Sequence, residues 1–177
     1  MIDAQATERF MAAPWLAEVD RDTKKAILNA LVEARAPAGA TLLEEDHPND
    51  HLTFLIEGSA AIQRTFGNGR RETITTLTAP TVFGTTSFFR PQAPSVTVQA
   101  TSDVWMLSLY HPAHEALRRD NPRAAEALAV AVVRALSERF DLLDKLFSDS
   151  MARTADESPR TSEWAGFRAR LFDERGL

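Results

Sequence analysis

Residues 82–100 (VFGTTSFFRPQAPSVTVQA) hold the side chains whose types and spacing most strongly indicate binding chemistry. Gly84 is followed by three hydroxyl side chains at what the sequence indicates is the start of a short helix. Successive backbone N–H groups at such a start can hold an anion, because their dipoles point toward it. The candidate ligand-binding residues of this stretch are Gly84, Thr85, Thr86, Ser87, Pro94 and Ser95. The backbone N–H groups of residues 84–87 are the ones that could hold a small anionic ligand.

The same stretch resembles the phosphate-binding cassette of the cyclic nucleotide-binding domain family, the sensor module of cAMP-dependent transcription factors, kinases and channels. In that family a glycine is followed by a glutamate and a short helical turn, and further on an arginine and a small residue lead into a strand. Aligned without gaps, Gly84 matches the glycine, Ser95 the small residue, and residues 96–100 the strand. Thr85 stands where the family has the glutamate, and Pro94 stands where it has the arginine.

The resemblance implies roles for the two side chains that this sequence replaces. The arginine is a cation that faces the cyclic phosphate, and the glutamate accepts a hydrogen bond from the ribose 2′-hydroxyl. Pro94 has no side-chain or backbone donor, and Thr85 can accept only as a neutral group. Losing the cation from a desolvated pair costs about 2–5 kcal/mol, or roughly 30- to 5,000-fold in affinity. We therefore expect that the pocket does not bind cAMP in the ordinary way.

Three outcomes stay open at this point: a pocket for another nucleotide-like or small anionic ligand, a silent pocket, and near-normal cAMP binding. Arg139 is a candidate replacement cation, because the family's ligand-facing polar pair on the long closing helix falls near Arg139 and Phe140. Arg90, in the cassette loop, is a second candidate. An arginine at either position is also typical of a solvated surface.

Periodicity predicts the elements that position this stretch. Residues 7–35 carry apolar side chains at helical steps, and Asp20 is a candidate N-cap within them. Residues 41–109 change to a period of two. Turn signals such as Gly58 and residues 67–69 divide this region into about eight short strands.

Residues 112–147 return to helical periodicity, with a cap-plus-proline start at Asn121 and Pro122. This order predicts a mainly β fold with flanking helices: a double-stranded β-helix (jelly roll, cupin-like) of the cyclic nucleotide-binding type with a long C-terminal helix. We expect residues 1–148 to form one such domain, and residues 149–177 to form a flexible linker and a short amphipathic tail.

Two segments carry patterns for contacts with other proteins. The long helix has a near-heptad apolar series, which predicts a homodimer through residues 122–147 or, alternatively, a stripe packed on the same domain. The series is Ala125, Ala129, Val132, Leu136, Phe140, Leu143 and Phe147. In the tail, Trp164, Phe167 and Leu171 share a helical face, which indicates either a docking peptide for a partner protein or a flap on the domain.

Composition narrows the functional classes. The 177 residues include no cysteine, which removes disulfides, thiolate metal sites and cysteine nucleophiles. Among the four histidines, His47 and His51 form one close pair and His111 and His114 another, but neither has a recognisable third ligand. No metal site and no resident cofactor are expected beyond a cyclic nucleotide or other small anion. Without a serine elbow beside a base, an enzyme is not expected either.

Charge and length give further expectations. A net charge of −5 and a pI near 5.4 disfavour general nucleic-acid binding. The residues after the long helix are too few for a helix-turn-helix, so no DNA binding by this chain alone is expected. Neither a signal peptide nor a membrane-length apolar run is visible, which favours a cytoplasmic protein with no membrane contact.

The sequence as a whole predicts a non-enzymatic, stand-alone regulatory sensor that works in signal transduction. It resembles a cyclic nucleotide-binding domain, and a homodimer is expected. The alternative is a protein-interaction or adaptor module with a silent pocket, acting through the long helix and the tail. Both follow from the resemblance and from the replaced cassette contacts.

Overall fold

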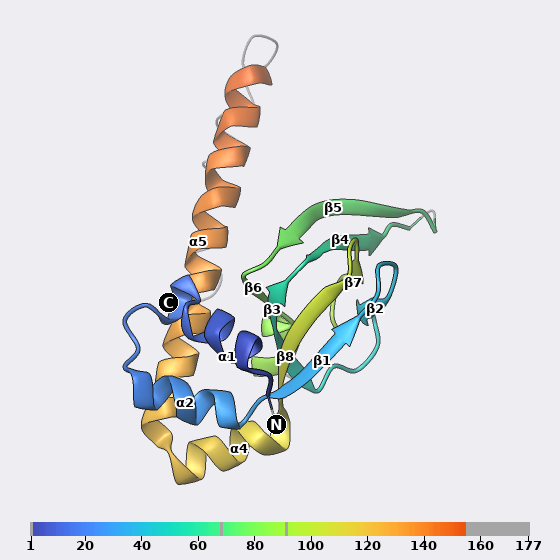
Figure 1. Ribbon diagram of the computed structural model, residues 1–177. Helices are drawn as coiled ribbons and strands as arrows, with labels where there is room; N and C mark the ends of the chain where they lie inside the picture. The colour runs from blue at the N-terminus through green and yellow to red at the C-terminus, as the bar shows by residue number, and fades with distance from the viewer. Residues whose placement is uncertain (1, 68, 91, 155–177) are drawn as a thin grey trace. The chain divides into compact units, whose positions relative to one another are not determined.

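A computed structural model describes residues 2–67, 69–90 and 92–154 of the chain, with only the backbone described for several residues after Asp141. The chain divides into two compact units, Met1–Ala135 and Leu136–Leu177. The first unit contains all the strands (Figure 1). The boundary between these compact units lies inside the long closing helix.

The described residues form eight strands in two four-stranded antiparallel sheets, an arrangement typical of a jelly roll (Figure 1). One sheet has the order β1-β8-β3-β6 and the other β2-β7-β4-β5. The strands are β1 (Val32–Ala36), β2 (Thr41–Leu43), β3 (His51–Glu57), β4 (Ser59–Thr65), β5 (Arg71–Thr78), β6 (Thr81–Phe83), β7 (Thr97–Ala100) and β8 (Val104–Tyr110). The predicted mainly β fold with flanking helices and a long C-terminal helix is confirmed.

Strand β3 contributes to two hydrophobic cores, one on each of its faces. Leu52, Phe54 and Ile56 belong to an outer core shared with the helices, whereas Leu55 belongs to an inner core of strand residues. Thr53 is buried, and its hydroxyl lies 3.1 Å from the Ser108 hydroxyl of β8. The inner core consists of Leu43, Leu55, Ala60, Leu77, Phe83, Val98, Ala100, Val104 and Met106.

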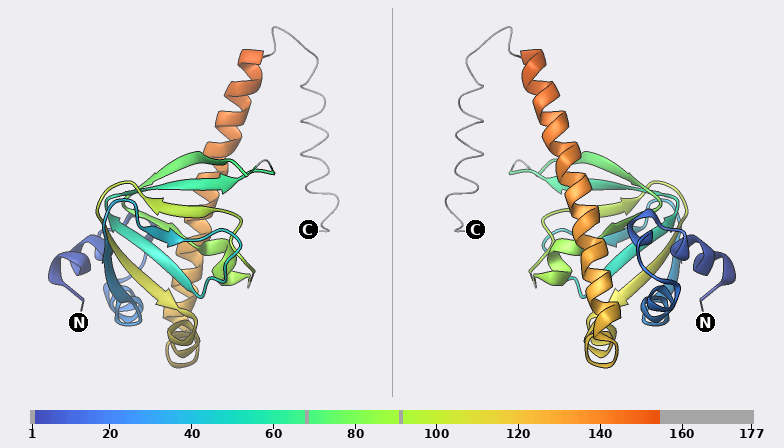
Figure 2. Two further views of the ribbon diagram at one scale, coloured as in Figure 1. Left: turned by 90° about the vertical axis from the view of Figure 1, so that its right-hand side faces the viewer. Right: turned by 90° about the vertical axis from the view of Figure 1, so that its left-hand side faces the viewer.

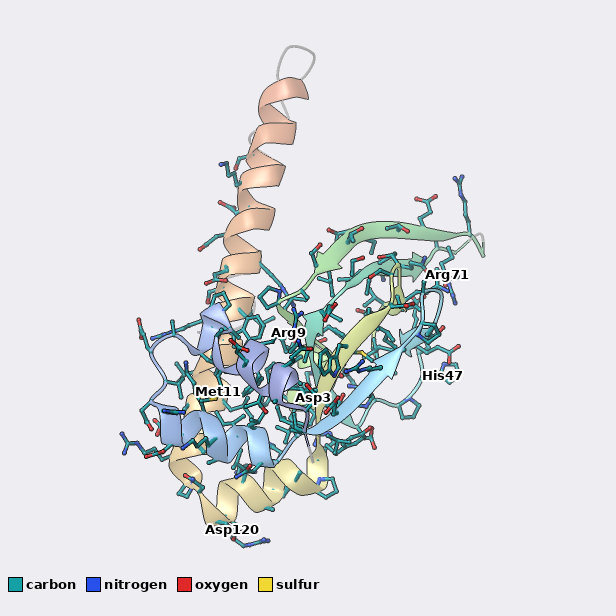
Figure 3. The ribbon with its side chains drawn as sticks, viewed as in Figure 1. Asp3, Arg9, Met11, His47, Arg71 and Asp120 are labelled. Atoms are coloured by element: carbon teal, nitrogen blue, oxygen red, sulfur yellow. The ribbon has the colours of Figure 1, made fainter. Side chains whose placement is uncertain are left out.

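The helices before the roll are α1 (Ala4–Met11), a 3-10 turn η1 (Pro14–Leu16) and α2 (Arg21–Asn29); α1 and α2 lie together outside the strands (Figure 2). Asp20 is the N-cap of α2, as predicted: its carboxylate accepts from the N–H groups of Asp22 (3.1 Å) and Thr23 (3.0 Å). The ion pair of Arg9 with Glu57 (3.1 Å) links α1 to the end of β3. Figure 3 labels Arg9.

The predicted helical stretch over residues 7–35 is wrong at its end. Helix α2 stops at Asn29, and Val32 begins β1, which pairs with β8 along its whole length. The apolar steps of Leu28, Leu31 and Val32 suit a helix, but the Val32 side chain is exposed on the edge strand while Leu31 enters the outer core. Pairing with β8 outweighs local periodicity here.

Two turn predictions are confirmed. Gly58 has a φ of 88°, and a Cβ there would collide with the Asp103 carbonyl oxygen, so glycine is needed between β3 and β4. The β4–β5 hairpin closes at residues 66–70, where the N–H of Phe66 donates to the carbonyl of Arg70 (2.9 Å) and the N–H of Gly69 donates to the carbonyl of Phe66 (2.8 Å).

The closing helices are α4 (His111–Asp120) and α5 (Pro122–Thr154). The predicted cap at Asn121 is confirmed, because its side-chain oxygen accepts from the Ala124 N–H at 3.1 Å. Helix α5 runs beyond residue 147, so the predicted linker is helical up to Thr154. The tail residues Trp164, Phe167 and Leu171 lie outside the described residues. No described helix is long and apolar enough to cross a membrane.

Candidate functional site

The cassette begins where β6 ends, at Gly84, the N-cap of the short helix α3 (Thr85–Phe89). Gly84 has a left-handed backbone with φ 77°. A Cβ at this position would lie 3.0 Å from the His51 carbonyl oxygen and 3.3 Å from the Asn49 side-chain nitrogen. Both the backbone angle and this close approach require glycine, so the position that sequence reasoning placed first is structurally constrained.

Ser87 and Asn49 tie the cassette to the loop before β3. The Asn49 side-chain amide donates to the Ser87 hydroxyl (2.9 Å) and to the His51 carbonyl (2.8 Å). The Ser87 hydroxyl donates in turn to the Gly84 carbonyl (3.2 Å), and Ser87 is almost fully buried. The Ser87 hydroxyl therefore accepts one hydrogen bond and donates another within the protein. The bond with Asn49 holds α3 against the loop before β3.

The remaining hydroxyls of α3 differ in exposure. Thr85 is buried, whereas Thr86 is exposed to solvent. Thr85, at the position that the resemblance gives to an acid, is therefore a buried neutral group. Of the candidate residues on α3, Thr86 is the one whose side chain is available at the surface.

Pro94 is buried, and its carbonyl accepts a hydrogen bond from the Asp46 N–H at 2.9 Å. Ser95 is exposed, and β7 begins at Thr97, one residue later than predicted from Val96. The Thr97 hydroxyl accepts from the Glu45 N–H at 3.2 Å. The position that the resemblance gives to a cation is thus occupied by a buried ring whose backbone is bonded to the loop before β3.

Charged groups next to this loop are arranged around Glu45. Its carboxylate accepts from the Thr65 N–H at 2.8 Å, and this bond is the largest cause of a lowered pKa for Glu45. The charges of Arg64 and Arg71 lower the pKa further. Arg71 lies near the tip of the β4–β5 hairpin (Figure 3). These arginines therefore interact with an ionised carboxylate already in the protein.

Arg139, the candidate replacement cation, lies in the second compact unit, whereas the cassette lies in the first. The Arg139 side chain is partly buried, and burial lowers its pKa, while the charge of Glu138 raises it. Its role as a ligand-facing cation remains a prediction. Arg90, the other candidate, is exposed at the end of α3.

Sequence reasoning missed the part played by the loop before β3. Asn49 and Asp46 contact the cassette directly, although they lie about 40 residues away in the chain. The turn-forming run of residues 45–50 was a signal for this loop, but its pairing with the cassette depends on the roll closing. Sequence alone could not supply that contact.

The histidine side chains contact other residues of the protein. His47 contacts the Glu45 carbonyl at 3.0 Å, and His51 contacts the Asp50 carboxylate at 3.0 Å. His111 stacks on Phe88 of α3, with ring centroids 4.4 Å apart. Within the described part of the chain, no three potential metal ligands are grouped as a metal ion would need.

Comparison with protein-family models gives a match to the cyclic nucleotide-binding domain over residues 33–121, which is half of the chain. The CRP-like cAMP-activated global transcriptional regulator of Mycobacterium tuberculosis is 28% identical over 122 residues. That match covers 68% of this chain and 54% of the regulator. The chain therefore spans about half the length of the curated relatives it matches.

Several solved structures are also similar to this chain. The N-terminal domain of a transcriptional regulator from Streptomyces coelicolor A3(2) is 27% identical with a TM-score of 0.63, covering 75% of this chain and 95% of that one. The catabolite activator protein of Thermus thermophilus is 25% identical with a TM-score of 0.62, covering 80% and 66%. A cyclic nucleotide-binding domain from Methylobacillus flagellatus, 17% identical with a TM-score of 0.70, covers 88% and 85% and shows the fold alone.

Proposed function

Because the chain belongs to the cyclic nucleotide-binding domain family, we propose that it is a regulatory sensor domain whose pocket does not hold cAMP in the ordinary way. Its ligand is then another nucleotide-like molecule or a small anion, and its occupancy shifts the closing helix. The regulatory role fits the matched relatives, which are transcriptional regulators by name.

The observation that carries the proposal is that Pro94 is buried and has no hydrogen-bond donor. The family resemblance assigns this position to the cation that faces the phosphate, and here a buried proline ring with no donor occupies it. Its carbonyl accepts a hydrogen bond from the Asp46 N–H, and this bond supports a loop that is already ordered without a ligand. Thr85 supports the same conclusion, since it is buried and uncharged where the resemblance implies an acid.

The test restores the two implied contacts. We expect the double variant Thr85→Glu, Pro94→Arg to bind cAMP about 30-fold or more tightly than the unaltered protein, because a cation facing a phosphate contributes about 2–5 kcal/mol. Isothermal titration calorimetry with cAMP, cGMP and a cyclic dinucleotide measures this. The control Thr86→Glu, Pro94→Arg places the acid at the exposed neighbouring position and lacks the sugar contact.

Two results would contradict the proposal. One is tight cAMP binding by the unaltered protein, which would mean that another group supplies the charge. In that case Arg139→Ala tests the candidate cation: a large loss of affinity assigns the role to Arg139, and unchanged affinity removes it. The other is a cyclic dinucleotide or other small anion failing to bind at any accessible concentration, which would favour the silent pocket.

A second candidate function is an interaction module that acts as a homodimer through α5. In the first unit, Val130 is 46% exposed, and in the second unit Phe140 is 60% exposed and Leu136 is 38% exposed. Leu136 and Phe140 are four residues apart and so share a helix face, and exposed apolar side chains on one face favour a helix-to-helix contact. The predicted series needs correction, because Ala125 and Val132 lie in the outer core of the first unit. The side chains of Leu143 and Phe147 lie outside the described part of α5.

Analytical ultracentrifugation tests the dimer. The variant Phe140→Ser should shift the protein toward monomer, because a buried phenylalanine in an interface contributes roughly 1.5–3 kcal/mol. Phe66→Ser is the matched control, since Phe66 is also exposed (46%) but lies on the β4–β5 hairpin. An unaltered protein that sediments as a monomer at high micromolar concentration would exclude this interface.

A further inference from the structure

A hollow of about 640 Å³ lies between α3, α4 and the first turns of α5. Its volume falls within the range of small-molecule pockets, about 300–1,000 Å³. Pro122, Ala125 and Ala129 of α5 line one side, and their short side chains leave the space open. All the lining residues belong to the first compact unit.

Aromatic rings from α3 and α4 line the hollow as well. Phe88 is stacked on His111, with planes 5° apart, and His114 lies 5.2 Å from Phe88 and 5.8 Å from Phe89 between ring centroids. Phe88 is buried, but Phe89 is 42% exposed. An exposed ring beside a hollow offers a π face, whose quadrupole attracts a cation.

The charges around the hollow are not balanced. Arg118 is paired with Glu115 at 3.1 Å, so these two charges largely offset each other. Glu126 is exposed at the rim, and among the described residues no ion pair includes it. Burial lowers the pKa of His114 below its ordinary value of 6.5, so at neutral pH that ring adds no positive charge. The hollow thus combines an exposed ring with one surplus carboxylate.

We propose that this hollow binds a small organic ammonium ion, with its charge over the Phe89 ring and balanced by the Glu126 carboxylate. Quaternary and tertiary ammonium groups suit such a site, because they are weakly hydrated and spread their charge over apolar surface. Phe88 and Phe89 belong to the cassette, but neither Thr85 nor Pro94 lines the hollow, so this proposal does not depend on the proposed pocket chemistry.

The test is a nuclear magnetic resonance titration of the 177-residue protein with choline and with its uncharged isostere, 3,3-dimethylbutan-1-ol. We expect saturable choline shifts at the residues around the hollow, with a dissociation constant on the order of 1 mM. The alcohol should bind at least about threefold more weakly, since it lacks the charge.

Two variants test which groups of the hollow contribute to choline binding, and a third is a control. Phe89→Leu keeps the apolar bulk but removes the ring, and Glu126→Gln removes only the charge; each should weaken choline binding about two- to fivefold. Asp120→Asn is the control, because Asp120 pairs with Arg119 (2.9 Å) at the end of α4 and does not line the hollow (Figure 3). The spectrum of each variant without ligand verifies its fold.

Three outcomes would overturn the proposal. The first is the absence of saturation up to about 20 mM choline. The second is equal binding of choline and the alcohol, which would make the hollow an apolar site. The third is unchanged choline affinity in both Phe89→Leu and Glu126→Gln, each correctly folded.

Discussion

At the scale of single residues, the cassette is held in place by contacts with residues 46–51. The Ser87 hydroxyl accepts from Asn49, and the Pro94 carbonyl accepts from the Asp46 N–H. Gly84 lies so close to the His51 carbonyl that a side chain would not fit. The types of these cassette residues could be read from the sequence, and so could the replaced acid and cation. Their partners could not, because Asn49 and Asp46 meet the cassette only when the roll closes. The residue types therefore carry the prediction of altered ligand binding, which stays a prediction, whereas the contacts of the cassette depend on the fold.

Replacing Gly84 tests this close packing. We expect Gly84→Ala to lower the free energy of unfolding by about 1–3 kcal/mol, because a Cβ combines a strained left-handed backbone with a carbonyl 3.0 Å away. Gly39→Ala is the control, since Gly39 also has a positive φ (86°) but has open space around its Cβ position. Urea denaturation measures both; equal losses would show that the contact with the His51 carbonyl contributes nothing.

The pKa of His114 predicts a dependence of stability on pH. Burial lowers this pKa below 6.5 in the folded protein, so below pH 6.5 the unfolded chain binds more protons than the folded chain. Stability from this group is complete above pH 6.5 and is lost as the pH falls from 6.5 through the lowered pKa. His114→Phe keeps the ring against Phe88 and Phe89 and should flatten the curve of melting temperature against pH.

The exposed His47 provides the control for that experiment. His47→Gln should leave the acid limb of the stability curve as it is in the unaltered protein. If His114→Phe and the unaltered protein lose stability in parallel below pH 6.5, burial of His114 is not the source of the dependence.

At the scale of elements, periodicity predicted strands, turns and helix starts where local signals were strong, and it failed where tertiary pairing decided. Asp20 and Asn121 cap their helices as predicted, because capping is a local bond. The segment from Val32 was predicted helical and is β1, because its hydrogen bonds go to β8, about 70 residues away. The apolar series of α5 was likewise divided between a core face and an exposed face that one-dimensional spacing cannot separate.

The anchoring of α3 gives a prediction at this scale. Ser87→Ala removes the acceptor of one Asn49 N–H and the donor to the Gly84 carbonyl, so we expect a loss of about 1–2 kcal/mol in unfolding free energy and faster amide exchange in α3. Thr86→Ala, on the exposed side of the same helix, should change little. Unaltered exchange rates in Ser87→Ala would mean that the Asn49 bonds do not hold the helix.

At the scale of the whole molecule, the chain has the family fold, and two of its residues differ from those that the resemblance assigns to ligand binding. The two sheets, the helices around them and the family match agree on what kind of domain this is. The relatives by name respond to cAMP, but this chain spans about half their length and places a buried proline and a buried threonine at the two positions implied to bind it. We therefore propose that this chain keeps the family fold without the family's ordinary mode of cAMP binding.

The central claim is tested most directly by the thermal stability of the unaltered protein in about 1 mM cAMP. If the dissociation constant is 1 mM or weaker, we expect a gain of at most about 0.4 kcal/mol in unfolding free energy, close to no shift in melting temperature. A dissociation constant near 10 μM would give about 2.7 kcal/mol and an evident shift. The first result is the one that the account predicts, and the second would contradict it.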